Sequence, residues 1–270
     1  MVVILIAILI IFITFLLLTV CRTGHPDLSK LQGWSYAHRG LHGNGVPENS
    51  MQAFRLAKEA GYGIELDVHL LADGNLAVIH DYLLLRTTGL PGKIEDLTTN
   101  QLKDFRLEGT EETIPTFQEV LDLYSGAAPL IVELKVDGES NNYGILAQTV
   151  CQMLESYQGV YCLESFDPRC VAWLRKHKPH LIRGQLAEDY LKGKNNIPWI
   201  LAALLRNNLL NIWSYPDFVA YKFSQRKVLG NTLCRKLWGG QGVAWTISSQ
   251  EEYNTAIQEG WLPIFEGFLP

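Results

Sequence analysis

Residues 64–70 alternate without exception between aliphatic and polar side chains, and this stretch restricts the possible folds more than any other part of the sequence. In an extended strand successive side chains point to opposite faces, so the four aliphatic residues share one face and Glu65, Asp67 and His69 share the other. A strand on the protein surface, with its polar face in water, is one interpretation. The alternative is a buried strand whose polar face builds a site.

The residues around this strand favour the second interpretation. Three other strand-like runs, at residues 37–40, 78–81 and 131–135, carry histidines, carboxylates and cations at or near their C-terminal ends. Isolated buried carboxylates are energetically costly, so a cluster of this kind needs a metal, a ligand or paired charges. If these four runs were unrelated surface strands, histidines, carboxylates and cations would not be expected at or near the C-terminal end of every one.

The rest of the sequence predicts an α/β fold in which strands and helices alternate with short connections. The pattern predicts eight strands after residue 34, and crossovers of this type return the chain to the same end of a parallel sheet. Eight such units in about 240 residues favour a closed (β/α)₈ TIM barrel, with a small insertion at residues 81–114 after the second strand. A doubly wound open sheet is the alternative, but the glycine-rich loop at residues 40–45 fits neither nucleotide-binding spacing.

The first 20 residues predict a membrane anchor. Val2 to Val20 form an uninterrupted apolar run of about 19 residues, long enough for a transmembrane helix. A cleaved signal peptide would need a positive start and a small-residue cleavage site, and a lipoprotein would need a smaller residue before Cys21. We therefore expect a single-pass membrane protein with an anchor at residues 1–21, a tether at 22–33 and a catalytic domain at 34–270. The nearest cations follow the span, which favours a cytoplasmic catalytic domain while leaving the side open.

Charge and cysteine content narrow the function. The formal net charge is −5 and no dense basic run is present, so a broad nucleic-acid-binding surface is not expected. A small ligand with one or two phosphates remains compatible, because a metal can supply positive charge. The five cysteines are odd in number and match no zinc or redox spacing, so we expect ordinary thiols with at most an opportunistic disulfide.

Five short motifs, in this order and spacing, resemble those of the glycerophosphodiester phosphodiesterase family, within the phospholipase-C-like phosphodiesterase superfamily. The motifs are His38-Arg39-Gly40, Pro47-Glu48-Asn49-Ser50, Glu65-Leu66-Asp67, His80-Asp81 and Glu133-Leu134-Lys135. Weaker echoes follow at residues 165–168 and 244–246. The resemblance covers nearly all of the chain from Trp34 onward and implies a (β/α)₈ barrel with an insertion after the second strand.

The resemblance also implies a role for each motif residue. Glu65, Asp67 and Glu133 would bind a divalent cation, Mg²⁺ or Ca²⁺, because hard cations prefer oxygen ligands. The other implied roles are an acid–base pair (His38 and His80), phosphate binding (Arg39 and Lys135), an apolar wall for the glycerol (Trp245) and support of the site (Glu48, Asn49 and Asp81).

The expected activity is hydrolysis of glycerophosphodiesters to glycerol 3-phosphate and an alcohol, part of glycerophospholipid breakdown. Two alternatives stay open: an enzyme acting at the membrane on lysophospholipids or glycerol-phosphate polymers, and an inactive anchored binding module. One departure from the family pattern concerns residues 263–267, where Pro-Ile-Phe-Glu-Gly replaces the aspartate-bearing segment that the family commonly has. The resemblance therefore does not predict which residues form the side of the pocket next to the eighth strand.

Overall fold

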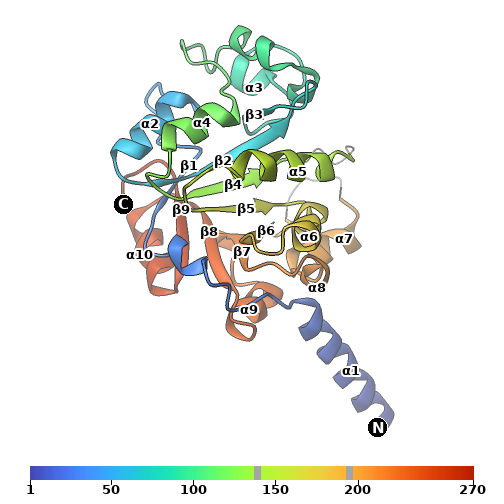
Figure 1. The fold of residues 1–270 in the computed structure, drawn as a ribbon. Coiled ribbons are helices and arrows are strands. Elements are labelled where there is room, and N and C mark those ends of the chain that lie inside the picture. The colour runs from blue at the N-terminus through green and yellow to red at the C-terminus, as the bar shows by residue number, and fades with distance from the viewer. Residues whose placement is uncertain (137–140, 193–196) are drawn as a thin grey trace.

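A computed structural model describes residues 1–136, 141–192 and 197–270 and contains a closed barrel of eight parallel strands (Figure 1). The barrel strands are β1 (Tyr36–His38), β2 (Gly63–Leu70), β4 (Leu130–Leu134), β5 (Tyr161–Ser165), β6 (Arg183–Ala187), β7 (Phe218–Lys222), β8 (Gln241–Ile247) and β9 (Trp261–Phe265). Strand β1 pairs in parallel with both β2 and β9, which closes the ring. The predicted (β/α)₈ barrel is therefore confirmed.

Helices cover the outside of the barrel, and several begin where the sequence places a capping residue. The helices that follow the barrel strands are α2 (Met51–Glu59), α4 (Phe117–Tyr124), α5 (Tyr143–Leu154), α6 (Pro168–His177), α7 (Trp199–Arg206), α8 (Asn211–Ser214), α9 (Leu229–Lys236) and α10 (Gln250–Gln258). Ser50 accepts a hydrogen bond from the Ala53 amide, and Thr116 forms a capping box with Glu119. Pro168 occupies the first turn of α6, where its missing amide hydrogen costs nothing.

The two faces of the barrel strands have different environments. Leu66 and Val132 pack in the layer between barrel and helices, together with Phe54 and Phe117. The opposite face points into the barrel, and its lower part is filled by a second apolar cluster that includes Ile131. Burying these aliphatic side chains contributes about 1.5–3 kcal/mol each. Because this second apolar cluster fills the lower part of the barrel, polar inward-facing residues are left at the C-terminal ends of the strands.

The predicted insertion at residues 81–114 is part of a small subdomain that follows β2 and begins with β3 (Leu76–Val78). Strand β3 pairs with β2 in antiparallel orientation, and the subdomain also contains α3 (Leu85–Thr88). Two 3₁₀ helices follow, at Ile94–Asp96 and Thr99–Asp104. Its apolar side chains form a separate cluster, and Figure 1 shows it above the ends of β2 and β4. Its position lets residues that follow β3 reach the mouth of the barrel.

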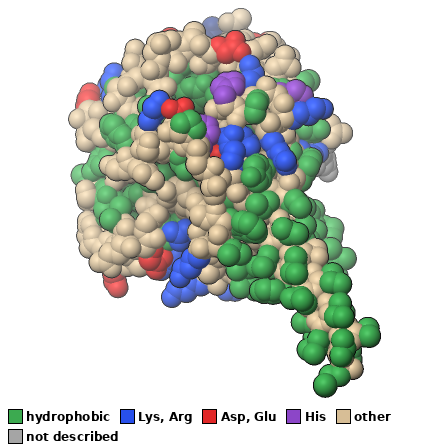
Figure 2. All heavy atoms as spheres, turned by 60° about the horizontal axis from the view of Figure 1, so that its bottom comes forward, with side chains coloured by type: hydrophobic (Ala, Val, Ile, Leu, Met, Phe, Trp, Pro, Cys, Tyr) green, Lys and Arg blue, Asp and Glu red, His purple; other side chains and the backbone are tan. Residues whose placement is uncertain are grey.

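The N-terminal helix corrects the membrane prediction. In the described part of the chain no helix has both the length and the apolar character needed to cross a membrane. Helix α1 (Val2–Leu18) has 17 residues, a length of about 26 Å, whereas the hydrocarbon core is about 30 Å thick. The predicted transmembrane anchor, and the single-pass localisation based on it, are wrong. Figure 2 shows α1 as a projecting column covered by hydrophobic side chains.

The segment that follows α1 lies against the barrel. Arg22 forms an ion pair with the buried carboxylate of Asp217, in which Nη2 donates to Oδ2 over 2.6 Å. A 3₁₀ helix at Leu28–Leu31 buries Leu31, whose carbonyl accepts a hydrogen bond from the Tyr36 hydroxyl at 2.7 Å. These contacts hold residues 22–33, the predicted tether, at the end of the barrel where the strands begin.

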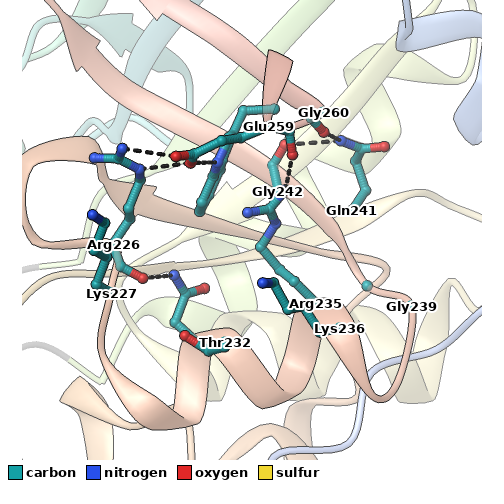
Figure 3. Close-up of a pocket in the computed structure, with 13 residues that line it drawn as sticks. Arg226, Lys227, Thr232, Arg235, Lys236, Gly239, Gln241, Gly242, Glu259 and Gly260 are labelled. Carbon is teal, nitrogen blue, oxygen red and sulfur yellow. Dashed lines mark hydrogen bonds and ion pairs between the residues drawn. The ribbon is translucent and has the colours of Figure 1, made fainter. Parts of the chain in front are cut away.

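A hollow of about 560 Å³ lies at this same end, between α9 and the first residues of β8 and β9 (Figure 3). It is lined by four cations but only one carboxylate, Glu259. Arg226 binds Glu259 with both Nε and Nη2, and the Arg235 guanidinium lies 3.6 Å from the centre of the Trp261 ring. None of the predicted site residues lines it, so this hollow is not where the sequence places the chemistry.

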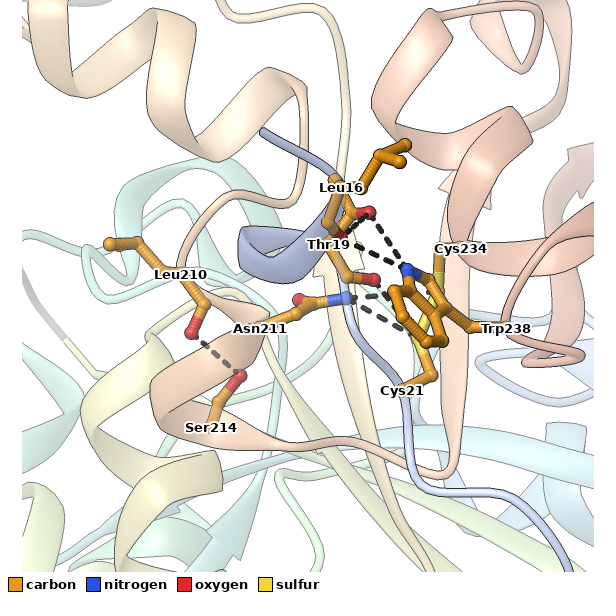
Figure 4. Close-up of a disulfide and its surroundings, with 8 residues drawn as sticks. All are labelled: Leu16, Thr19, Cys21, Leu210, Asn211, Ser214, Cys234 and Trp238. Atoms are coloured by element: carbon orange, nitrogen blue, oxygen red, sulfur yellow. Dashed lines mark hydrogen bonds between the residues drawn. A yellow bond between two sulfur atoms is a disulfide. The ribbon is translucent and has the colours of Figure 1, made fainter. Parts of the chain in front are cut away.

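A disulfide joins the end of α1 to the barrel. Cys21 is bonded to Cys234 of α9, across 213 residues of sequence, and both residues are buried (Figure 4). Trp238 adds a hydrogen bond from Nε1 to the Leu16 carbonyl. The expectation of ordinary thiols holds for Cys151, Cys162 and Cys170, which are buried and free. The other two form the single disulfide that the expectation allowed, and the sequence did not identify the pair because only the fold brings these distant residues together.

Reducing this disulfide is expected to lower the free energy of unfolding by about 2–4 kcal/mol, because the bond restricts the unfolded chain over a very long loop. Urea denaturation with and without reductant measures the loss. The Cys21→Ser/Cys234→Ser variant should match the reduced protein and show no further response to reductant. An unchanged denaturation midpoint on reduction would contradict the expectation.

Candidate active site

His38 and Glu266 meet at the seam where the barrel closes. His38 ends β1, and Glu266 directly follows β9, the neighbouring strand. His38 Nδ1 lies 2.5 Å from Glu266 Oε2, and because a carboxylate only accepts, the shared proton belongs to Nδ1. This hydrogen bond lowers the pKa of Glu266 to about 2. Burial lowers the pKa of His38, while Glu266 opposes the shift. In the neutral ring this contact fixes the tautomer with the proton on Nδ1, which leaves Nε2 as the nitrogen that can accept a proton.

Three carboxylates form a buried cluster inside the same end of the barrel. Glu65, Asp67 and Glu133 come from β2 and β4, and each offers an oxygen within 4.8 Å of the others. Burial and repulsion by the other two raise the pKa of Glu65 well above its usual range. Burial also raises the pKa of Glu133 to about 7. So much negative charge in a small buried space is stable only with positive charge beside it.

Lys135 supplies part of that charge. Its Nζ lies 3.1 Å from Asp67 Oδ1 and 2.9 Å from Glu133 Oε1. Burial of Asp67 would raise its pKa, but Lys135, His80 and Arg39 outweigh this and hold it well below its usual range. The donor set of the cluster is made of oxygen alone, so it fits Mg²⁺ or Ca²⁺ rather than a soft metal.

The loop after β1 places Arg39 and Asn49 against this cluster. Both residues adopt a left-handed backbone conformation, with φ of 53° and 52°. Arg39 Nε lies 3.3 Å from Asp67 Oδ2, and its Nη1 donates to Glu48 at 3.0 Å. Asn49 Nδ2 donates to Asp67 Oδ2 at 2.8 Å. The loop therefore fixes the orientation of the Asp67 carboxylate.

The insertion contributes the second histidine. His80 Nδ1 lies 2.7 Å from Asp81 Oδ1, so this imidazole also has a carboxylate partner. Arg86 binds the other oxygen of Asp81 and donates from Nη2 to Glu48 at 2.6 Å, which links the insertion to the loop after β1. Burial lowers the pKa of His80 to about 4, with Lys135 adding to the shift and Asp67 and Asp81 opposing it.

A hollow of about 40 Å³ brings these residues together. It is lined by His38, Arg39, Glu65, His80, Glu133, Glu164, Phe166, Leu186, Trp245 and Ile264. The Trp245 and Phe166 rings meet edge to face, 5.5 Å apart, and Trp245 Nε1 donates to the Ala220 carbonyl. Of the predicted site residues, six line the hollow, Asp67 and Lys135 contact those that do, and Glu48, Asn49 and Asp81 stand behind them.

Two carboxylates of this site were not among the predicted residues. Glu164 lies opposite Glu133 in the β4–β5 register, is only 1% exposed, and its Oε2 lacks a hydrogen-bond partner among the described residues. The signal was its inward-facing place in a strand that aligns with residues 130–134. Glu266 lay in the segment that departs from the family pattern. His69 shares the face of Glu65 but turns to the insertion, where its Nε2 contacts the His80 carbonyl at 3.2 Å.

The fold is a TIM barrel, and comparisons with known proteins show the class of enzyme to which this chain belongs. Residues 38–218 match the model of the glycerophosphoryl diester phosphodiesterase family. A glycerophosphodiester phosphodiesterase of Caldanaerobacter subterraneus is 31% identical over 83% of this chain and 89% of its own length. One of Bacillus altitudinis is 36% identical over 58% of this chain and 67% of its own.

A solved structure supports the fold. The Oleispira antarctica phosphodiesterase, solved in complex with the product sn-glycerol-3-phosphate, has a TM-score of 0.71 and 23% sequence identity, covering 86% of this chain and 92% of that one. The chain thus belongs to the glycerophosphoryl diester phosphodiesterase family, and the predicted family and hydrolase class are confirmed.

Proposed function

We propose that this protein is a cation-dependent phosphodiesterase that hydrolyses glycerophosphodiesters to glycerol 3-phosphate and an alcohol by acid–base catalysis with His38 and His80. The observation that carries the proposal is the pair of imidazoles beside one hollow, each with a carboxylate on Nδ1. This arrangement leaves Nε2 of each ring for proton transfer, as a general acid–base pair requires.

Arg39 and Lys135 bind the phosphate of the substrate in this proposal. Both cations lie beside the carboxylate cluster, and Arg39 can hold two phosphate oxygens with its planar fork. Trp245 forms an apolar wall for the glycerol carbons. An anionic phosphate beside the imidazoles also favours their protonated form, which opposes the effect of burial on the pKa of His80.

The proton transfers follow from these positions. The substrate hydroxyl beside the phosphate attacks phosphorus to give a transient cyclic phosphate, which water then opens. One imidazole accepts the proton of the hydroxyl, and the other donates a proton to the departing alcohol. Glu266 and Asp81 stabilise the positive charge that each ring gains. Glu65, Asp67 and Glu133 would hold Mg²⁺ or Ca²⁺, and such an ion, when bound, neutralises phosphate charge and lowers the pKa of a coordinated hydroxyl.

Glycerophosphocholine hydrolysis by the full chain tests the proposal. We expect release of glycerol phosphate with Mg²⁺ or Ca²⁺ and none with a chelator. Turnover of an acylated lysophospholipid in place of glycerophosphocholine would move the substrate class to lysophospholipids. If a folded protein turned over neither substrate, the enzyme proposal would be wrong and the site would be a binding module.

A further inference from the structure

A second group of metal-ligand atoms lies at the seam of the barrel, outside the carboxylate cluster. His38, His42 and Glu266 each offer one atom, and these atoms lie within 4.8 Å of one another. Two of the residues come from the end of β1 and the loop after it, and the third follows β9. The donor set differs from the deeper cluster, because two imidazole nitrogens join one carboxylate.

His42 gives this group its independent evidence. Its Nε2 is buried and has no hydrogen-bond partner among the described residues, although it lies 3.9 Å from Glu266 Oε1. A buried nitrogen without a partner loses its hydrogen bonds to water and gains none in exchange. Glu266 remains 39% exposed, and a hollow of about 410 Å³ beside it is lined by His42, Gly43 and Gly267. An ion can therefore reach the group from solvent.

We propose that His38 Nδ1, His42 Nε2 and Glu266 form a zinc site that regulates the proposed phosphodiesterase. Zinc prefers nitrogen and carboxylate ligands in a tetrahedron with bonds of about 2.0–2.1 Å, which places ligand atoms roughly 3.3 Å apart. In this structure His38 Nδ1 lies 2.5 Å from Glu266 Oε2, and His42 Nε2 lies 3.9 Å from Glu266 Oε1. These two distances lie on either side of the zinc value. Water completes the tetrahedron. Arg39 is the nearby cation that opposes binding, but it is engaged by Asp67 and Glu48.

Zinc at this position inhibits the enzyme. The metal takes the place of the proton that His38 Nδ1 shares with Glu266, and that proton moves to Nε2, so that no proton is gained or lost. His38 Nε2 faces the carboxylate cluster, 3.8 Å from Glu65 Oε2. With the metal on Nδ1 and the proton on Nε2, the imidazole has no free nitrogen to accept a proton, and it cannot release the proton that it holds without becoming an imidazolate. This effect rests on the proposed function, whereas the binding of zinc does not.

Direct binding tests the site without any activity measurement. The full chain, with saturating Mg²⁺ to fill the carboxylate cluster, competes for Zn²⁺ with a chromophoric chelator. We expect one zinc per chain. His42→Ala removes one of three protein ligands, so its affinity should fall by at least the roughly 10–100-fold that the loss of a group orienting a ligand costs. Asp67→Asn, which alters only the deeper cluster, should bind zinc like the wild type. No stoichiometric binding, or equal affinity in His42→Ala, would overturn the proposal.

A second variant separates the loss of a zinc ligand from the loss of the fold, and an activity assay tests the regulatory role. Glu266→Gln should weaken zinc binding as His42→Ala does, and the thermal unfolding midpoints of both show whether the fold is intact. In the assay, micromolar Zn²⁺ should inhibit the wild type and spare His42→Ala. Inhibition equal in both would overturn the regulatory role. If the wild type lacks phosphodiesterase activity but binds zinc through His42, the proposed function fails while the site stands.

Discussion

His38→Ala is expected to lower kcat on glycerophosphocholine by about 10²–10⁴-fold, the usual contribution of a general acid or base. The imidazole at this position lines the hollow, and Glu266 fixes its tautomer. Alanine removes one member of the proposed acid–base pair while leaving Arg39 and Lys135 to bind the phosphate, so KM should change far less than kcat. Steady-state kinetics with saturating cation measures both constants.

His177→Ala is the matched control, because His177 is exposed on α6 and lies outside the site. It should retain the wild-type kcat. The kcat of Glu266→Gln should lie between those of His38→Ala and His177→Ala. The amide can keep a hydrogen bond to the His38 ring but cannot stabilise its positive charge. If His38→Ala and His177→Ala were equally active, the assignment of His38 would be wrong.

The response of stability to a divalent cation is expected to grow with pH. Burial raises the pKa of Glu133 to about 7, whereas in the unfolded chain its value returns to about 4.5. Without a cation, the stabilisation from protonated Glu133 is present below pH 4.5 and is lost as pH rises through 7. A cation requires the ionised form, so Mg²⁺ or Ca²⁺ should restore stability above pH 7 by about 2.7 kcal/mol at 100 times Kd.

Urea denaturation at pH 5.5 and pH 8, with Ca²⁺ or with chelator, measures this effect. Glu133→Gln should lose most of the cation response and become less sensitive to pH without cation, because its side chain cannot ionise. Glu111→Gln, at a carboxylate that is 95% exposed, should behave like the wild type. A cation response that is the same at both pH values would count against a cation site at Glu133.

The barrel could be predicted because each strand carries its own signal. Residues 64–70 alternate with the period of a strand, and capping residues such as Ser50 and Asp167 mark where helices begin. Helix α8 carries no such signal, because its four residues are too few to show a helical period. The membrane prediction failed because an apolar run in the sequence does not set where the helix ends, and α1 stops at Leu18.

Contacts within the site could be predicted where the two residues are neighbours in the sequence. They could not be predicted where the contact depends on the pairing of the first and last strands of the barrel. His80 and Asp81 are neighbours in the sequence, so their contact could be anticipated. Glu266 is 228 residues away from His38, and only the pairing of β9 with β1 brings them together. The Cys21–Cys234 disulfide depends on the same kind of long-range approach. No sequence period reports such contacts.

The seam between β1 and β9 joins the first strand of the barrel to the last. His38 is among the first residues of the barrel to leave the ribosome, but the carboxylate that orients it arrives with the last strand. A chain that stops before residue 266 would lack the carboxylate that contacts His38 Nδ1. In the proposed mechanism, the orientation of the His38 imidazole therefore depends on a last strand that has been made and paired with β1.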